Sequence, residues 1–198
     1  MSQSLEQIAS KRKIKVHDPF AEFLLAEPSL HSFEISLLDC YRFAGHACHA
    51  ITGAFLTTEA AIRFLFPETN ICERGDLLIE FGSQLHERAT GPRSNVISYI
   101  TGSWGDSGFP GLKDKFKRKD LLSYGRSSLG ERAIRFKRVS TGQAMIIEYD
   151  PTHYLSILRN TQQFPEKWRT EIIAILGNQN RVLKVMNDSG EMLTSPFR

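Results

Sequence analysis

A long run of apolar residues at helical spacing limits what this chain can fold into. The run covers residues 49–66, and Pro67 follows it directly. Apolar residues three and four positions apart lie on one face of a helix, and proline prevents a helix from continuing. The sequence therefore predicts one long helix with a buried face over residues 49–66. The residues that set this spacing are Ile51, Phe55, Ala61, Ile62, Leu65 and Phe66.

Strand-like segments follow the helix. Residues 77–83 (LLIEFGS) and 95–102 (NVISYITG) are each predicted to form a strand. Residues 132–150 contain two alternating apolar runs on either side of STGQ, which predicts a β-hairpin with Gly142 at its turn. Because a hairpin pairs its strands antiparallel, we expect a mainly antiparallel sheet.

The C-terminal part is predicted to be largely helical. Helical patterns cover residues 153–162 and 166–178, the second with Gly177 at its end, and residues 181–186 could add a last strand. The expected fold class is α+β, in which the long helix packs on the sheet and a helical extension follows. The chain divides into an N-terminal lead-in, an α+β core and a C-terminal helical extension, at residues 1–32, 33–150 and 151–198.

Composition and charge narrow the class of protein. Apolar residues make up 41% of the 198 residues, enough for a hydrophobic core, and the net charge of +3 does not by itself indicate a nucleic-acid partner. The three cysteines have no disulfide-framework spacing, which favours a reducing cytoplasm. The N-terminal segment lacks the apolar stretch of a secretory signal, and no apolar run reaches the roughly 20 residues of a membrane helix. We therefore expect a cytoplasmic protein without a membrane segment.

A short turn ahead of the long helix gathers residues that bind metals. The segment GHACH places His46, Cys48 and His49 within four positions, directly after Gly45. Imidazole nitrogen and thiolate sulfur are standard zinc ligands, and the dipole at a helix N-terminus favours a thiolate, which could serve as a ligand or as a nucleophile. The same residues could instead be a buried cysteine and hydrogen-bonded histidines that bind nothing.

Several motifs in order resemble one known family. A Gly-His-any-Cys turn opens a helix in GHACHAITG, and a Thr-Gly pair precedes a glycine-rich loop in NVISYITGSWGDSGF, with LKDKF after it. This order is similar to that of the formylmethanofuran dehydrogenase E-subunit-like family, over about residues 33–150. The resemblance implies an α+β core, often a homodimer, with a metal near the histidine and cysteine of the turn. The C-terminal zinc finger of some members is missing here, because no cysteine follows Cys72.

The chain departs from the family pattern at the expected ligands. His49 stands where the family carries a proline, and the family's second cysteine is missing ahead of the Thr-Gly pair. The resemblance then implies that His49 or His86 joins His46 and Cys48 in place of the lost thiolate. Such a nitrogen-rich site suits a divalent transition metal, with zinc first and nickel or iron as alternatives. Three ligands would leave an open position for catalysis, whereas four would indicate a structural or storage role.

The glycine-rich loop SWGDSGFPG could line a substrate pocket over this metal. Trp104 and Asp106 lie in the loop, and Lys113 and Lys115 follow it and could position a small anionic substrate. GDSG imitates a serine-protease segment, but a catalytic triad is defined by a geometry that a tetrapeptide does not supply. The loop could equally be shaped for tight packing, with its lysines as solvated surface.

Three functions remain open from the sequence. The first is a metal-binding protein that serves as an accessory to redox metabolism. The second is a metal-dependent enzyme that acts on a small anionic or carbonyl substrate, and the third is a structural domain whose turn binds nothing. Acidic residues interrupt the basic stretches of residues 112–138, so nucleic-acid binding is not expected.

Overall fold

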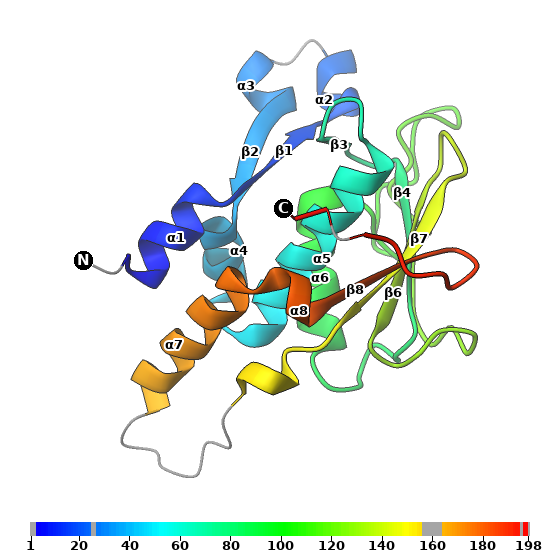
Figure 1. Cartoon of the computed structure of the whole chain (residues 1–198). Helices are drawn as coiled ribbons and strands as arrows, with labels where there is room; N and C mark the ends of the chain where they lie inside the picture. Colours follow the sequence, from blue (N-terminus) through cyan, green and yellow to red (C-terminus); the bar gives the residue numbers. More distant parts are fainter. Residues whose placement is uncertain (1–2, 25–26, 156–163, 195, 198) are drawn as a thin grey trace.

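Helix α5 (His49–Leu65) runs through the middle of the molecule, with two sheets beside it (Figure 1). The computed structural model describes residues 3–24, 27–155, 164–194 and 196–197. Among the described residues, one sheet has five strands and the other has three. The fold is α+β, as the sequence predicts.

Helix α5 confirms the helix predicted over residues 49–66. Every residue from Ile51 to Ile62 is buried, so the helix is covered on all sides and not on one face alone. Its buried threonine hydroxyls are satisfied within the helix: Thr52 Oγ1 donates to the Cys48 carbonyl at 2.8 Å, and Thr58 Oγ1 donates to the Ala54 carbonyl at 2.7 Å. Such bonds to the preceding turn let polar residues occupy a buried helix.

The five-stranded sheet packs against α5 through its central hairpin. Its strand order is β5-β4-β6-β7-β8, and the neighbouring pairs are antiparallel except for β4 and β5. Strands β6 and β7 form the predicted hairpin, and Gly142 in its turn has φ +77°, where a side chain would be strained. The strands are β4 (Leu77–Phe81), β5 (Leu122–Ser123), β6 (Ala133–Arg138), β7 (Ala144–Tyr149) and β8 (Leu183–Asn187).

The strand predicted at residues 95–102 is wrong. This segment belongs to helix α6 (Thr90–Thr101), which packs against α5 and ends at Gly102 with φ +69°. Its β-branched residues suggest a strand, but Val96, Ile97 and Ile100 are all buried, which is the spacing of one helix face. Tertiary packing therefore overrides the local strand preference of these residues.

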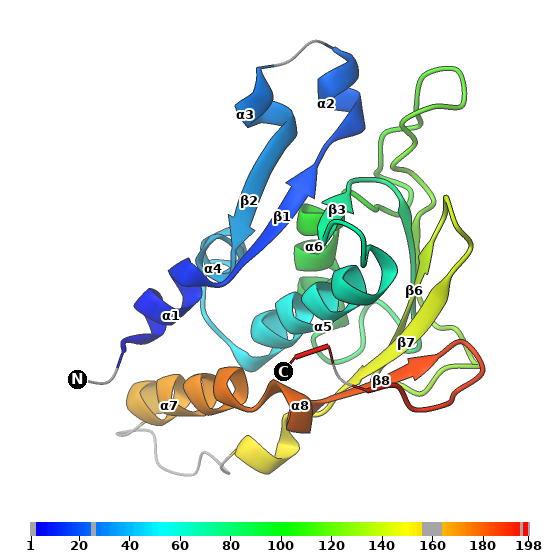
Figure 2. The same cartoon turned by 45° about the horizontal axis from the view of Figure 1, so that its top comes forward.

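An arm at the N-terminal end extends away from α5 and the five-stranded sheet (Figures 1 and 2). The arm comprises residues 13–24 and 27–36. Its two prolines begin short helices, because the first turn of a helix does not need the N–H that proline lacks. Strand β1 pairs antiparallel with β2 and parallel with β3. The elements are β1 (Lys13–His17), α2 (Pro19–Phe23), α3 (Pro28–His31), β2 (Ser32–Ser36) and, beyond the arm, β3 (Ile71–Glu73).

Serine caps start the two helices that flank the arm. Helices α1 (Leu5–Lys11) and α4 (Leu37–Ala44) begin after Ser4 and Ser36, and each serine side chain accepts a hydrogen bond from the backbone N–H three residues on. The side chain at that third position bonds back to the serine N–H. This reciprocal capping box is a strong local signal for a helix start.

The C-terminal part places one helix and one strand against the core. Helix α7 (Phe164–Gly177) confirms the helix predicted over residues 166–178, and helix α8 (Gln179–Val182) leads into β8, the predicted last strand. The other predicted helix, at residues 153–162, lies mostly outside the described residues, and its first two residues belong to a short 3-10 helix, η1 (Thr152–Tyr154). In the part of the chain that the structure describes, no helix has the length and apolar character to cross a membrane.

Candidate functional site

The turn that carries GHACH is shaped by the helices on either side of it. Helix α4 ends at Gly45, whose φ of +78° is the left-handed conformation that glycine adopts freely. Helix α5 then starts at His49, with Cys48 as its N-cap residue. The chain therefore turns between two helices and places the cysteine at a helix N-terminus, as the sequence predicts.

The structure brings three of the four predicted metal ligands into one pocket. His46, Cys48 and His49 all contribute to its lining, although His46 is exposed whereas Cys48 is only 8% exposed. The fourth residue, His86, lies exposed in the loop between β4 and α6 and does not line this pocket. The predicted set is therefore divided between a pocket and a surface loop.

The side chains of the predicted set do not converge on a single point. Within the described ranges, no three of His46, Cys48, His49 and His86 have potential ligand atoms that all lie within 4.8 Å of one another. His46 Nδ1 donates to the Ala44 carbonyl at 3.0 Å, and His49 Nε2 is also committed to a partner. A metal at this turn would need these side chains to rotate.

Helix α7 fixes the position of His49. His49 Nε2 donates to the carboxylate of Glu171 at 3.1 Å, and the Trp168 ring lies 4.2 Å from the imidazole, centroid to centroid. Trp168 is held in turn by its Nε1, which donates to the Ala47 carbonyl at 2.7 Å. Burial lowers the pKa of His49 below its usual 6.5 although Glu171 acts in the opposite direction. His49 is therefore a neutral imidazole at pH 7.

The N-termini of two helices meet at this pocket. We call it the α5–α6 pocket, and its volume is about 510 Å³. Cys48 starts α5 and Ala89 starts α6, and in the part of the chain described neither N-cap side chain satisfies the first backbone N–H groups. A helix N-terminus carries partial positive charge and free N–H donors. Its lining includes Cys48, His49, Thr90, Arg93, Tyr149 and Trp168.

Arg93 supplies an uncompensated charge to the α5–α6 pocket. Its Nε and Nη2 atoms are out of contact with solvent and have no hydrogen-bond partner among the described residues. Burial lowers the pKa of the Arg93 guanidinium to about 10, so it is still charged at pH 7. Its guanidinium lies 5.9 Å from the centroid of the Phe81 ring, which is a weak partner for a cation.

The other charges that line the pocket are paired. Arg88 forms an ion pair with Glu131 at 2.9 Å between exposed side chains, and Arg132 forms one with Asp150. The two opposite charges within each pair cancel at the rim. The net positive charge of the pocket therefore comes from Arg93 and from the helix N-termini. A negative ligand would complement that charge.

The structure places the predicted substrate residues elsewhere. Trp104 is half-buried, and Asp106, Lys113 and Lys115 are exposed, all in the loop that follows the C-terminal end of α6. None of the four lines the α5–α6 pocket, which lies at the opposite end of that helix. The loop is packed tightly instead: a Cβ at Gly108 would lie 2.6 Å from backbone atoms of Arg118.

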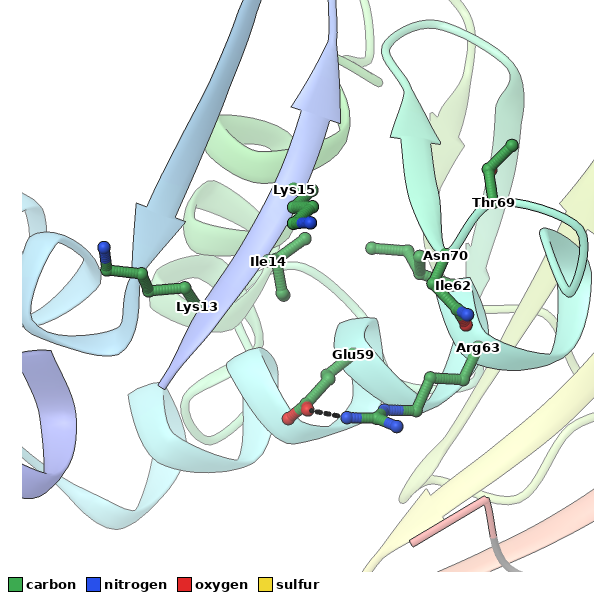
Figure 3. A pocket seen from close by; sticks show the side chains of 8 residues that line it. All are labelled: Lys13, Ile14, Lys15, Glu59, Ile62, Arg63, Thr69 and Asn70. Atoms are coloured by element: carbon green, nitrogen blue, oxygen red, sulfur yellow. Dashed lines mark hydrogen bonds and ion pairs between the residues drawn. The ribbon is translucent and has the colours of Figure 1, made fainter. Parts of the chain in front are cut away.

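A second hollow lies between β1 and α5 (Figure 3). Three of its charged residues are paired: Lys13 with Glu34, and Glu59 with both Arg63, at 3.0 Å, and Arg12, at 2.7 Å. Lys15 is exposed and is in no ion pair among the described residues. Lys13 points away from the hollow in Figure 3 and pairs with Glu34 at 2.8 Å. This hollow therefore offers less to a charged ligand than the α5–α6 pocket does.

The sequence alone does not reveal the residues that define the pocket. Arg93 lies beside a segment whose local pattern predicts a strand, so nothing places its side chain near the GHACH turn. Glu171 and Trp168 come from a helix more than a hundred residues away in the chain. Trp168 and Glu171 are three residues apart and so lie on one helix face, and this spacing is the only hint in the sequence that both could contact the same partner.

Comparisons with known proteins leave the chain without an assigned family. No family model matches it, and no curated protein or solved structure shows significant similarity. The resemblance to the formylmethanofuran dehydrogenase E-subunit-like family therefore stays a prediction from the motifs of residues 33–150.

Proposed function

We propose that the α5–α6 pocket binds a small anionic molecule through Arg93. The observation that carries this proposal is the pair of buried guanidinium nitrogens, Nε and Nη2, that have no partner among the described residues. A buried charge without hydrogen bonds is costly, and proteins rarely keep one without a use. Nε and one terminal nitrogen of an arginine can bind a carboxylate or a phosphate with two parallel hydrogen bonds. Because Nε and Nη2 of Arg93 are out of contact with solvent, the side chain would have to turn towards the pocket to make these bonds.

The surrounding elements support an anion at the same place. The first turns of α5 and α6 direct backbone N–H groups and partial positive charge towards the pocket. Thr90, the first residue of α6, also lines the pocket, with its hydroxyl 2.7 Å from the hydroxyl of Ser83. Helix ends and an arginine together form a more favourable anion site than either feature alone, because their fields add.

The pocket suits a ligand that also has an apolar body. Tyr149 and Trp168 form part of its wall, and the Tyr149 hydroxyl donates to the His49 carbonyl at 3.0 Å, which fixes the ring. A volume of about 510 Å³ is in the range of small-molecule sites. A carboxylate or phosphate attached to a ring or a short carbon chain would therefore fill it.

His49 gives the pocket a chemical role beyond binding. A neutral imidazole whose Nε2–H bonds to Glu171 has no proton on Nδ1, which can then accept one. A ligand held by Arg93 would lie in the same pocket as this base. Such a pair is the usual requirement for proton abstraction from a bound carboxylate or carbonyl compound.

NMR titration tests the location of the bound anion. We would add phenyl phosphate, benzoate and the uncharged analogue benzamide to isotope-labelled protein and follow the side-chain signals of Trp168 and His49. We expect the two anions to shift these signals saturably and benzamide to shift them weakly. Shifts confined to other surfaces, or equal shifts with all three compounds, would contradict the proposal.

Metal binding at the GHACH turn is a second candidate function. The observation that favours it is that His46, Cys48 and His49 line one pocket from a single turn. We propose zinc as the ion, with Cys48 as the thiolate ligand, in line with the family resemblance of the GHACH motif. Elemental analysis of untagged protein tests it: one equivalent of zinc should be lost in Cys48→Ser and His46→Ala and kept in His86→Ala, since His86 lies outside the pocket.

We also propose that the protein works in the cytoplasm. Cys40, Cys48 and Cys72 are all free and buried, which supports a reducing compartment. Burial raises the pKa of the Cys40 and Cys72 thiols to about 12, so both stay protonated. Subcellular fractionation of the native cells would test the location.

A further inference from the structure

Two histidines and a glutamate meet at the tip of the arm. His17 is the last residue of β1, Glu22 lies in α2, and His31 is the last residue of α3. The potential ligand atoms of these three side chains all lie within 4.8 Å of one another. We call this group the arm site, and it is separate from the α5–α6 pocket.

The local fold of the arm brings the three residues together. His17 pairs with Ser32 in the β1–β2 ladder, which places His31 beside it. The Asp18 N–H donates to the His31 carbonyl at 2.7 Å, and the Glu22 N–H donates to the Asp18 carbonyl at 3.0 Å. One strand register and one helical turn therefore fix the backbone positions of all three side chains.

Hydrogen bonds also orient both imidazole rings. His17 Nδ1 lies 2.8 Å from the Glu73 carboxylate, while its Nε2 lies 3.2 Å from the Glu22 carboxylate. His31 Nδ1 lies 3.1 Å from the Ser32 hydroxyl. A histidine that binds a metal through one nitrogen generally holds a carboxylate or another acceptor with its other nitrogen, and Glu73 stands in that relation to His17.

We propose that the arm site binds a divalent transition metal, with His17, Glu22 and His31 as ligands. Two imidazoles and one carboxylate favour zinc over magnesium or calcium, which take oxygen ligands, and over copper(I), which takes thiolates. Ligand atoms each about 2 Å from a common zinc ion are within reach, because they already lie within 4.8 Å of one another. Three protein ligands leave a fourth position for water.

The metal would link separate elements of the arm. It joins the end of β1 to α2 and α3, whose exposed large side chains include Phe23 and Leu30. A metal cross-link stabilises the folded form in proportion to its affinity, since the unfolded chain does not hold the ligands together. We therefore expect zinc to stabilise the arm.

Zinc titration of the full-length, untagged chain tests the arm site. After chelator treatment, calorimetry should show one equivalent of bound zinc that is lost in His17→Asn and in His31→Gln, each checked for folding by circular dichroism, whether or not the GHACH turn binds a further equivalent. The exposed His153→Ala is the matched control and should bind as the unchanged chain does. Glu73→Gln should keep the stoichiometry and weaken the affinity roughly 10- to 100-fold, because it only orients His17.

A triple variant separates this site from a metal at the GHACH turn. His46→Ala, Cys48→Ser and His49→Gln together should leave zinc binding at the arm site unchanged. If the triple variant loses the zinc while His17→Asn keeps it, or if the unchanged chain binds no zinc, the arm site is not a metal site. If the unchanged chain binds no zinc, His17 serves only as the partner of Glu22 and Glu73.

Discussion

Glu171 on α7 accepts a hydrogen bond at 3.1 Å from Nε2 of His49 on α5, and the two residues lie 122 positions apart in the chain. The Glu171 side chain is only 8% exposed, so this contact is shielded from solvent. The C-terminal helix thus completes a pocket that begins at the GHACH turn. The position of His49 depends on this contact and on Trp168 beside it.

The protonation of His49 provides a test of this arrangement. Because burial lowers its folded-state pKa below 6.5, we expect its ring signals to titrate below pH 6.5. Its contribution to stability is then present above pH 6.5 and is lost as the pH falls through the folded-state pKa, since the unfolded chain takes up the proton first. NMR titration of the His49 ring measures this directly, and Glu171→Gln should lower the midpoint further. A midpoint at or above 6.5 would show that the ring is not buried as described.

Gly53 tests the contact between α5 and the hairpin. A Cβ at this position would overlap the Tyr149 ring, which is fixed by its hydrogen bond to the His49 carbonyl. We expect Gly53→Ala to lower the free energy of unfolding by about 1–3 kcal/mol through overpacking, despite the better helix propensity of alanine. Gly91→Ala in α6 is the matched control, because its Cβ would meet nothing closer than 3.5 Å. Equal stability of the two variants in urea unfolding would argue against this packing.

Asp18 connects the arm to the rest of the molecule. Its carboxylate pairs with Arg118 at 2.7 Å and with Arg74 at 3.1 Å, and it also caps α2. The Asp18 side chain is 13% exposed, so its removal leaves poorly solvated arginines. We expect Asp18→Ala to lower the free energy of unfolding by about 3–5 kcal/mol.

Asp120→Asn is the matched control for Asp18. Asp120 pairs with Lys117 at 3.0 Å, but both side chains are about half exposed. We expect a change of about 0–1 kcal/mol, as for most exposed pairs. If Asp18→Ala is as mild as this control in denaturant unfolding, the Arg74–Asp18–Arg118 cluster does not hold the arm in place.

The main elements of the fold could be predicted because their signals are local. Apolar spacing and Pro67 define α5, and alternating residues around a turn glycine define the β6–β7 hairpin. Helix α6 could not be identified in this way, because Val96, Ile97 and Ile100 favour a strand locally and become helical only by packing on α5. The pairing of β1 with β3 is also a contact between distant residues, which no local pattern records.

The candidate site could be predicted only at the GHACH turn. Its histidines and cysteine are visible because they are adjacent in the chain, and the structure does place them in one pocket. Arg93 and Glu171 reach that pocket through tertiary packing, so their roles could not be inferred from spacing. The order of the chain suggests that Trp104, Asp106, Lys113 and Lys115 belong with the turn, but the length of α6 separates their loop from the pocket.

The affinity for phenyl phosphate, compared between the unchanged chain and Arg93→Met, is the most direct measurement of anion binding at the α5–α6 pocket. Arg88→Met serves as the control, because Arg88 lines the same pocket but is already paired with Glu131. We expect calorimetry to show roughly 10- to 150-fold weaker binding for Arg93→Met, because a hydrogen bond to a charged group contributes about that factor to affinity. We expect little change for Arg88→Met. Equal affinity of Arg93→Met and the unchanged chain, or no binding to either, would contradict the proposed role of Arg93.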